Sequence, residues 1–350
     1  MKETAKRAFV AALVFVGVIV AALALWKLKV ILALLFTGLI IAAAMRPGVD
    51  ALRRLHIPRL AGIFVHYLAL AGAITLVLWF VVPIAQEQIT KAVPTSRAEL
   101  KSATKHSTGV KHEILKRIQQ RLNELPKGDK LVKPTLDVTK TAFEVLIGIF
   151  FTFASAAYWI FERERAERVL LAALPRKRRR VVRDTWNLID GKLGAYVRGQ
   201  LLLVVFVATV LSFVFWLIGL RFWLLVGAFA GIVELIPVIG PLAAGAVAVG
   251  VGFTTSWRVA LAAGIAVLAV RLVEDYVVIP KVLGGAVGLT PLTVLFSVAA
   301  VAVLFGGFSV LLAIPFVAML ATIIDVVLLK KDPGAEETPA VLFPAKEAES

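Results

Sequence analysis

Two groups of polar residues interrupt the apolar second half of the chain and are its best candidates for chemistry. The first is the string ELIPVIGP, from Glu234 to Pro241, inside an otherwise apolar stretch from Phe222 to Trp257. Pro237 and Pro241 each lack a backbone N–H, so each leaves a carbonyl one turn earlier without its helical partner. We expect these carbonyls and the carboxylate to line a polar path through the membrane. A kink that only packs against a neighbour, with Glu234 near the interface, is the structural alternative.

The second group is a charged triplet with helical spacing. Arg271, Glu274 and Asp275 occupy positions i, i+3 and i+4, which places all three charges on one helix face. Each charge costs about 2.5–3.5 kcal/mol at the centre of a membrane helix, so the triplet must face protein or water. The arginine neutralises one carboxylate and leaves one negative charge for a solute or a cation. A purely structural ion pair near the membrane boundary fits the same spacing.

The sequence patterns of several other kinds of functional site are absent. The chain has no cysteine, its four histidines form no metal-binding pattern, and it contains no Walker A string. Paired aspartates, HExxH and GxSxG motifs are absent as well. We therefore expect no metal, no cofactor and no enzymatic activity, and a gradient or a partner chain must supply any energy.

The composition requires that lipid solvates much of the chain. Of the 350 residues, 60% are apolar and only 18% are charged, and the mean hydropathy is +0.89. The net charge of +16 would suggest nucleic-acid binding in a soluble protein, but here the basic residues lie between apolar runs. We interpret them as topology signals and as contacts to anionic lipids of the bilayer, and we expect no nucleic-acid partner.

Apolar runs predict five transmembrane helices in the first part of the chain. They cover residues 8–26, 30–45, 60–86, 145–161 and 199–220. A cleavable signal peptide is the alternative for the first run, but this run is longer than a signal-peptide core and a second run follows it at once. Amphipathic patterns over 114–125 and 182–197 predict a helix in the soluble segment after the third span and a helix in the membrane interface.

The second half must contain broken helices. Basic residues in the short second and fourth loops place both loops and both termini in the cytoplasm, so the number of crossings is even and about eight. As one helix, residues 282–324 would be about 65 Å long, twice the hydrocarbon thickness of about 30 Å. We expect breaks at Pro291, Gly306, Gly307 and Pro315. The fold class is therefore all-α, a polytopic transmembrane protein with broken or re-entrant helices in its C-terminal half.

These patterns divide the chain into six parts. The Pro-, Ala- and Glu-rich end has the composition of a disordered tail. The parts are transmembrane helices 1–3 (1–86), an extracytoplasmic helical segment (87–140), helix 4 (141–161), a cytoplasmic basic amphipathic loop (162–198), helices 5–8 as a transport core (199–329) and a disordered cytoplasmic tail (330–350).

Three strings taken together resemble a known family of permeases. They are IPVIGP at Ile236–Pro241, PKVLGGAVGLTP at Pro280–Pro291, and FGG at Phe305–Gly307 leading to AIP at Ala313–Pro315. The string YVRGQ at Tyr196–Gln200 also resembles the start of that family's fifth span. Over residues 196–325 the order and the spacing of these strings resemble those of the autoinducer-2 exporter family, also called the AI-2E or PerM-like permease family.

The resemblance implies an eight-span permease of the bacterial inner membrane with both termini in the cytoplasm. It also implies an external helical segment after the third span and homo-oligomers, with pentamers as one form. Members are linked to export of a quorum-sensing furanone signal, and some are described as sodium/proton antiporters. Val238, Thr290 and Asp275 stand where Tyr, His and Asn are common in the family, and these departures bear on the identity of the solute.

The leading hypothesis is therefore a permease that exports a small polar organic solute, similar to autoinducer-2, by a gradient or by facilitated diffusion. A sodium/proton antiporter is the alternative within transport. A membrane scaffold without transport activity is the alternative of another class. The predicted transport pathway consists of Glu234, Pro237, Gly240, Pro241, Arg271, Glu274, Asp275, Tyr276, Pro280, Pro291, Gly306, Gly307 and Pro315.

Overall fold

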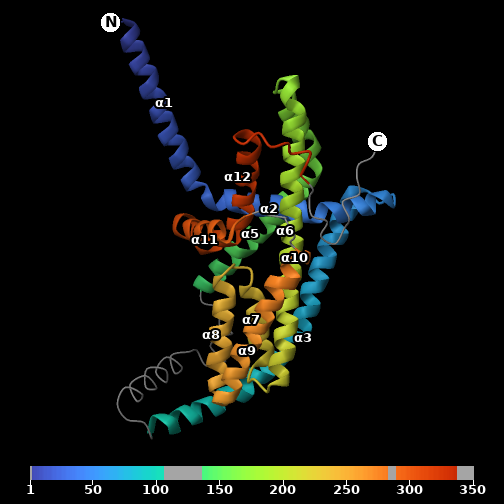
Figure 1. Ribbon diagram of the computed structural model, residues 1–350, viewed down its shortest axis with the longest axis vertical. Coiled ribbons are helices and arrows are strands. Elements are labelled where there is room, and N and C mark those ends of the chain that lie inside the picture. Colours follow the sequence, from blue (N-terminus) through green and yellow to red (C-terminus); the bar gives the residue numbers. More distant parts are fainter. Residues whose placement is uncertain (1, 106–135, 283–288, 337–350) are drawn as a thin grey trace. The chain divides into compact units, whose positions relative to one another are not determined.

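The computed structural model describes residues 2–105, 136–282 and 289–336, and these residues form helices without any strand (Figure 1). The predicted all-α membrane fold is confirmed: in the described part of the chain, six helices are long and apolar enough to cross a membrane. The fold divides into two compact units. Unit 1 comprises Met1–Pro47, Gly148–Val197 and Gly285–Ser350, and unit 2 comprises Gly48–Ile147 and Arg198–Gly284.

The first four helices follow the apolar runs but extend beyond some of them. They are α1 (Lys2–Lys27), α2 (Lys29–Arg54), α3 (Arg59–Lys105) and α5 (Leu136–Ala172). Pro58 stands directly before α3, where its missing N–H costs no helical hydrogen bond. Large apolar side chains such as Phe15 and Trp79 are exposed along these helices, as expected of surfaces that face lipid.

Helix α6 (Arg176–Leu217) differs from the prediction because it is one continuous helix of 42 residues. The sequence pattern separated an interfacial helix over 182–197 from a span beginning at Gly199. A glycine inside a helix costs only about 1 kcal/mol relative to alanine, so Gly194 and Gly199 do not interrupt the helix. The helix ends where Gly219 takes a φ of 70° and Leu220 donates to the carbonyl of Phe215.

Three shorter helices form the core of unit 2 together with the second half of α6. They are α7 (Trp223–Val233), α8 (Ile239–Phe253) and α9 (Trp257–Val273), and α8 packs against both of the others (Figure 1). At 1.5 Å per residue, α7 is about 16 Å long, which is half the hydrocarbon thickness. The apolar stretch from Phe222 to Trp257, which the string ELIPVIGP interrupts, therefore forms a hairpin of two short helices. A π-helical turn (Glu274–Val278) and α10 (Ile279–Val282) follow α9.

The C-terminal half of unit 1 breaks at the predicted positions. Thr290 caps α11 (Pro291–Phe305) by accepting from the N–H of Thr293, and Gly306 with a φ of 92° ends the helix. A 3₁₀ segment (Gly307–Leu312) then leads into α12 (Ala313–Val327), which carries Pro315 in its first turn. Pro291 and Pro315 occupy helix starts, where a proline is tolerated.

The chain after α12 is ordered further than the composition suggests. Residues 330–336 belong to the predicted disordered tail, yet Pro333 is buried and Glu336 lies 2.6 Å from the buried ammonium group of Lys192 in α6. A buried lysine needs such a partner, and this pairing holds the first part of the tail in place. The rest of the predicted tail, and the amphipathic helix expected over 114–125, lie outside the described residues.

Candidate functional site

Three carboxylates of unit 2 surround the guanidinium of Arg271. Its Nη1 lies 3.1 Å from Oε1 of Glu234 and 3.3 Å from Oε2 of Glu274. Its Nη2 and Nε lie 2.8 and 3.1 Å from the two carboxylate oxygens of Asp275, the two-pronged geometry that arginine forms with carboxylates. We call Glu234, Arg271, Glu274 and Asp275 the acidic cluster. The structure thus joins the two polar groups that the sequence showed 37 residues apart.

The acidic cluster is unbalanced in charge. Three carboxylates face one guanidinium, so two negative charges remain when all four groups are ionised; the triplet alone predicted one. Only 7% of the Glu234 side chain and 2% of the Glu274 side chain are exposed, against 41% for Asp275. Oε1 of Glu274 is buried and has no hydrogen-bond partner among the described residues. A buried acceptor without a partner is costly, which makes this oxygen a candidate ligand atom.

The turn between α7 and α8 positions Glu234. Glu234 follows the last residue of α7, and Val238 takes a φ of 67°, which is rare for a β-branched residue. Gly240 approaches the chain so closely that a Cβ there would lie 2.1 Å from the carbonyl oxygen of Val233. Only glycine fits at this position, so the hairpin depends on it.

The carbonyls that the prolines were expected to free each accept one hydrogen bond within the turn, and their part in a polar path stays a prediction. A proline at 237 releases the carbonyl of Val233, but that oxygen accepts from the N–H of Ile236 at 2.9 Å. A proline at 241 releases the carbonyl of Pro237, but that oxygen accepts from the N–H of Ile239 at 2.7 Å. Pro237 and Pro241 shape the turn, and the cluster's polar atoms come from side chains.

Gln200 of α6 was missed as a site residue. Its side chain is buried, and Nε2 donates to the carbonyl oxygen of Glu234 at 3.0 Å. This bond satisfies a carbonyl at the end of α7 and fixes the backbone that carries the Glu234 carboxylate. A lone amide in an apolar helix was the available signal, because such a group needs a buried partner.

The other predicted pathway residues are not members of the acidic cluster. Tyr276 and Pro280 continue the same helical segment in unit 2 and are exposed, Tyr276 to 78%. Pro291, Gly306, Gly307 and Pro315 belong to unit 1, where they begin or end helices. Their predicted role in transport stays a prediction, whereas their role in breaking the helices is visible.

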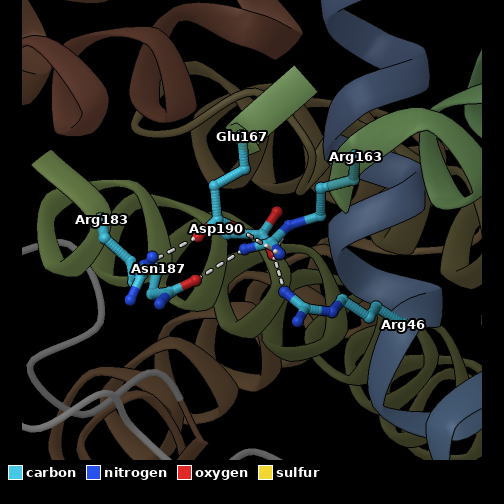
Figure 2. Close-up of polar contacts among 6 residues, drawn as sticks. All are labelled: Arg46, Arg163, Glu167, Arg183, Asn187 and Asp190. Carbon is cyan, nitrogen blue, oxygen red and sulfur yellow. Dashed lines mark hydrogen bonds and ion pairs between the residues drawn. The ribbon is translucent and has the colours of Figure 1, made fainter. Parts of the chain in front are cut away.

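A second charged cluster lies in unit 1 and was not predicted (Figure 2). Asp190 of α6 lies 2.5 Å from Nη1 of Arg46 in α2 and 3.2 Å from Nε of Arg163 in α5. Arg163 also donates to Oδ1 of Asn187 at 2.7 Å. Glu167 forms ion pairs with Arg163 at 3.4 Å and with Arg183 at 3.2 Å. We call this set the basic junction: Arg46, Arg163, Glu167, Arg183, Asn187 and Asp190.

The basic junction ties three helices of unit 1 together. It joins α2, α5 and α6 beside the stacked rings of Trp159 and Trp186, whose centroids are 5.8 Å apart. Only 6% of the Arg163 side chain is exposed, and removing its partners would leave a buried charge. The arrangement is that of a structural lock.

Known proteins resemble this chain over most of its length. A sequence model described as "AI-2E family transporter" matches residues 10–329. The Bacillus subtilis (strain 168) protein named "Putative transport protein YrrI" is 24% identical over 308 residues, covering 84% of this chain and 85% of the relative. "Putative transport protein YueF" of the same organism is 26% identical over 279 residues, or 75% of each chain. The family description and both names point to membrane transport rather than catalysis.

Proposed function

The chain belongs to the AI-2E family of transporters, and from this premise we propose that it exports a small polar organic solute across the bacterial inner membrane past the acidic cluster. Membership of the family and the relatives' names support a membrane transport function for a multi-pass protein. The solute, the direction, the cytoplasmic termini and assembly into homo-oligomers such as pentamers are parts of this proposal.

The acidic cluster carries the proposal. Its buried carboxylate oxygen, Oε1 of Glu274, is an acceptor for a hydroxyl or amine hydrogen of a passing solute. A solute that donates to it replaces water without leaving the carboxylate unpaired. The α7–α8 hairpin supports this assignment because two helices too short to span the hydrocarbon place irregular backbone beside these groups, as in secondary transporters.

Sodium/proton antiport is a second candidate that the same cluster favours. Three carboxylates around one arginine provide oxygen ligands and spare negative charge, which suit a cation that alternates with a proton. In this mechanism the carboxylates bind the coupled ions, whereas in solute export they bind hydrogen-bond donors. The two candidates share a site and differ in the transported species.

Flux through purified protein in liposomes tests the proposal. Vesicles loaded with autoinducer-2 should release it faster with the wild-type chain than without protein, and Glu274→Gln should slow release at least ~10-fold, the loss of one charge-assisted hydrogen bond. Glu162→Gln is the matched control, because its carboxylate is 54% exposed in a surface pair.

A second readout separates the candidates. A pH-sensitive dye inside the same vesicles reports proton movement when sodium is added outside. Sodium-dependent dissipation of a pH gradient without autoinducer-2 release would replace solute export by antiport. If neither readout responds to the wild-type chain and Glu234→Gln and Pro237→Ala leave every cellular phenotype unchanged, the scaffold alternative replaces both.

A further inference from the structure

The tip of the α5–α6 hairpin in unit 1 combines exposed cations with exposed apolar side chains. Arg176, Lys177 and Arg178 open α6 and are exposed. Beside them in the sequence stand Val169 and Leu170 at the end of α5 and Val181 in α6, with exposed fractions of 65%, 39% and 41%. We call these six residues the basic tip.

The neighbouring arginines differ because each has a partner within the protein. Arg179 donates to the carbonyl oxygens of Leu174 and Ala172 at the end of α5. Arg180 pairs with Asp184 at 3.5 Å, and Arg183 pairs with Glu167 in the basic junction. Among the residues that the structure describes, the side chains of Arg176, Lys177 and Arg178 form no ion pair and no hydrogen bond.

The position of these three cations favours an external anion. The first turn of α6 contains no acidic residue, and the positive end of the helix dipole adds to the charge there. In the part of the chain that the structure describes, Asp184 is paired with Arg180 and Glu336 with Lys192, and no carboxylate pairs with the three cations of the basic tip. These three charges are therefore available to an external anion.

The apolar side chains indicate which anion this is. A soluble acidic partner requires only the cations, whereas cations beside exposed valine and leucine are typical of a surface that enters the headgroup layer of a membrane. The charged end of α5 begins at Glu162, directly after the apolar run, so at most about 16 Å of helix separates this run from Ala172 and the basic tip.

We propose that the basic tip docks on anionic phospholipid headgroups, with the three cations binding phosphate and Val169, Leu170 and Val181 entering the boundary of the acyl chains. The proposal does not depend on the transported solute. It predicts that lipid charge controls the position of this hairpin, so that the tip rests on an anionic membrane and leaves a neutral one.

The absence of cysteine from the chain allows a direct test. A Val169→Cys variant of the full-length protein, labelled with an environment-sensitive fluorophore, is reconstituted into vesicles of phosphatidylcholine alone or with phosphatidylglycerol, each containing brominated lipid as a quencher. We expect quenching in the phosphatidylglycerol vesicles, relief by added salt, and little quenching in phosphatidylcholine.

Two variants in the same background decide the role of the cations. Replacing Arg176, Lys177 and Arg178 by glutamine should shift the equilibrium between docked and free tip about a hundredfold toward free. Replacing Arg53, Arg54 and Lys330 by glutamine removes the same charge elsewhere and should leave quenching unchanged. Equal quenching in both lipids, or equal loss in both triple variants, would overturn the proposal; so would a probe that remains in water in every vesicle.

Discussion

The two charged clusters of this protein use similar side chains but balance them differently. The basic junction sets three arginines against two carboxylates and an amide, and its six members bind one another (Figure 2). The acidic cluster sets three carboxylates against one arginine and leaves a buried oxygen of Glu274 without a hydrogen bond among the described residues. Both contain nearly buried groups, Arg163 in one and Glu274 in the other.

The difference shows that burial alone does not identify a functional site in a membrane protein. The basic junction carries one surplus positive charge, and the buried Nε of Arg163 also lacks a hydrogen bond among the described residues, but this nitrogen lies 3.2 Å from the carboxylate of Asp190. The acidic cluster carries two surplus negative charges around the unbonded Oε1 of Glu274, which is unfavourable unless a proton, an ion or a solute satisfies these groups in turn. The size and the sign of the surplus charge therefore separate a structural lock from a candidate transport site.

The largest expected effect is the loss of the central arginine of either cluster. Arg271→Met leaves the nearly buried carboxylates of Glu234 and Glu274 without a cation and should lower the free energy of unfolding by about 3–5 kcal/mol. Arg163→Met leaves Asp190 with Arg46 and Glu167 with Arg183, and it should lower the free energy of unfolding by about 1–3 kcal/mol. Unfolding of the detergent-solubilised chain by dodecyl sulfate titration measures this. Arg165→Met is the control, because its side chain is 74% exposed and its pair is worth at most about 1 kcal/mol. An Arg163 variant as mild as this control would contradict the lock.

A smaller effect tests the hairpin that only the acidic cluster depends on. Gly240→Ala places a methyl group against the carbonyl of Val233 and should cost about 1–3 kcal/mol. Gly250 lies in the same helix with open space around its Cβ position, so Gly250→Ala should be neutral or stabilising. The same titration compares the two, and flux should fall only for Gly240→Ala. Equal behaviour would mean that the turn geometry does not position the cluster.

The sequence revealed most of the acidic cluster but not the basic junction. The acidic triplet was visible because three charges at i, i+3 and i+4 share a helix face whatever the fold. The basic junction was not visible, because Arg163 and Asp190 lie on different helices and only the α5–α6 hairpin brings them together. The partnership of Glu234 with Arg271 also needed the fold, although each residue alone had been singled out.

Local rules had mixed success. Pro291, Gly306 and Gly307 mark helix boundaries as predicted, because proline and glycine act through their own backbone. The same rule did not predict the new donors of the carbonyls of Val233 and Pro237, because the N–H groups of Ile236 and Ile239 come from a turn that a helix pattern does not contain. Sequence reasoning also divided α6 into two elements, although polar and apolar halves can share one helix.

The smallest expected effect on stability compares Asp275 of the acidic cluster with Asp184, an ion-paired aspartate that belongs to neither cluster. Asp275 and Asp184 are both partly exposed and paired with an arginine on their own helical segment, so Asp275→Asn and Asp184→Asn should each change the free energy of unfolding by at most about 1 kcal/mol. Transport assays on reconstituted protein should find a loss for Asp275→Asn alone. Equal losses of transport in Asp275→Asn and Asp184→Asn would contradict a specific role of the acidic cluster in transport.

Flux through Glu274→Gln and Glu167→Gln, measured side by side in liposomes at equal inserted protein, tests the central claim most directly. Both variants neutralise a mostly buried glutamate that pairs with an arginine. If the acidic cluster borders the route, Glu274→Gln loses at least ~10-fold in autoinducer-2 release or sodium-dependent proton flux, whichever the wild type performs, and Glu167→Gln retains it. Wild-type flux through Glu274→Gln would contradict the account.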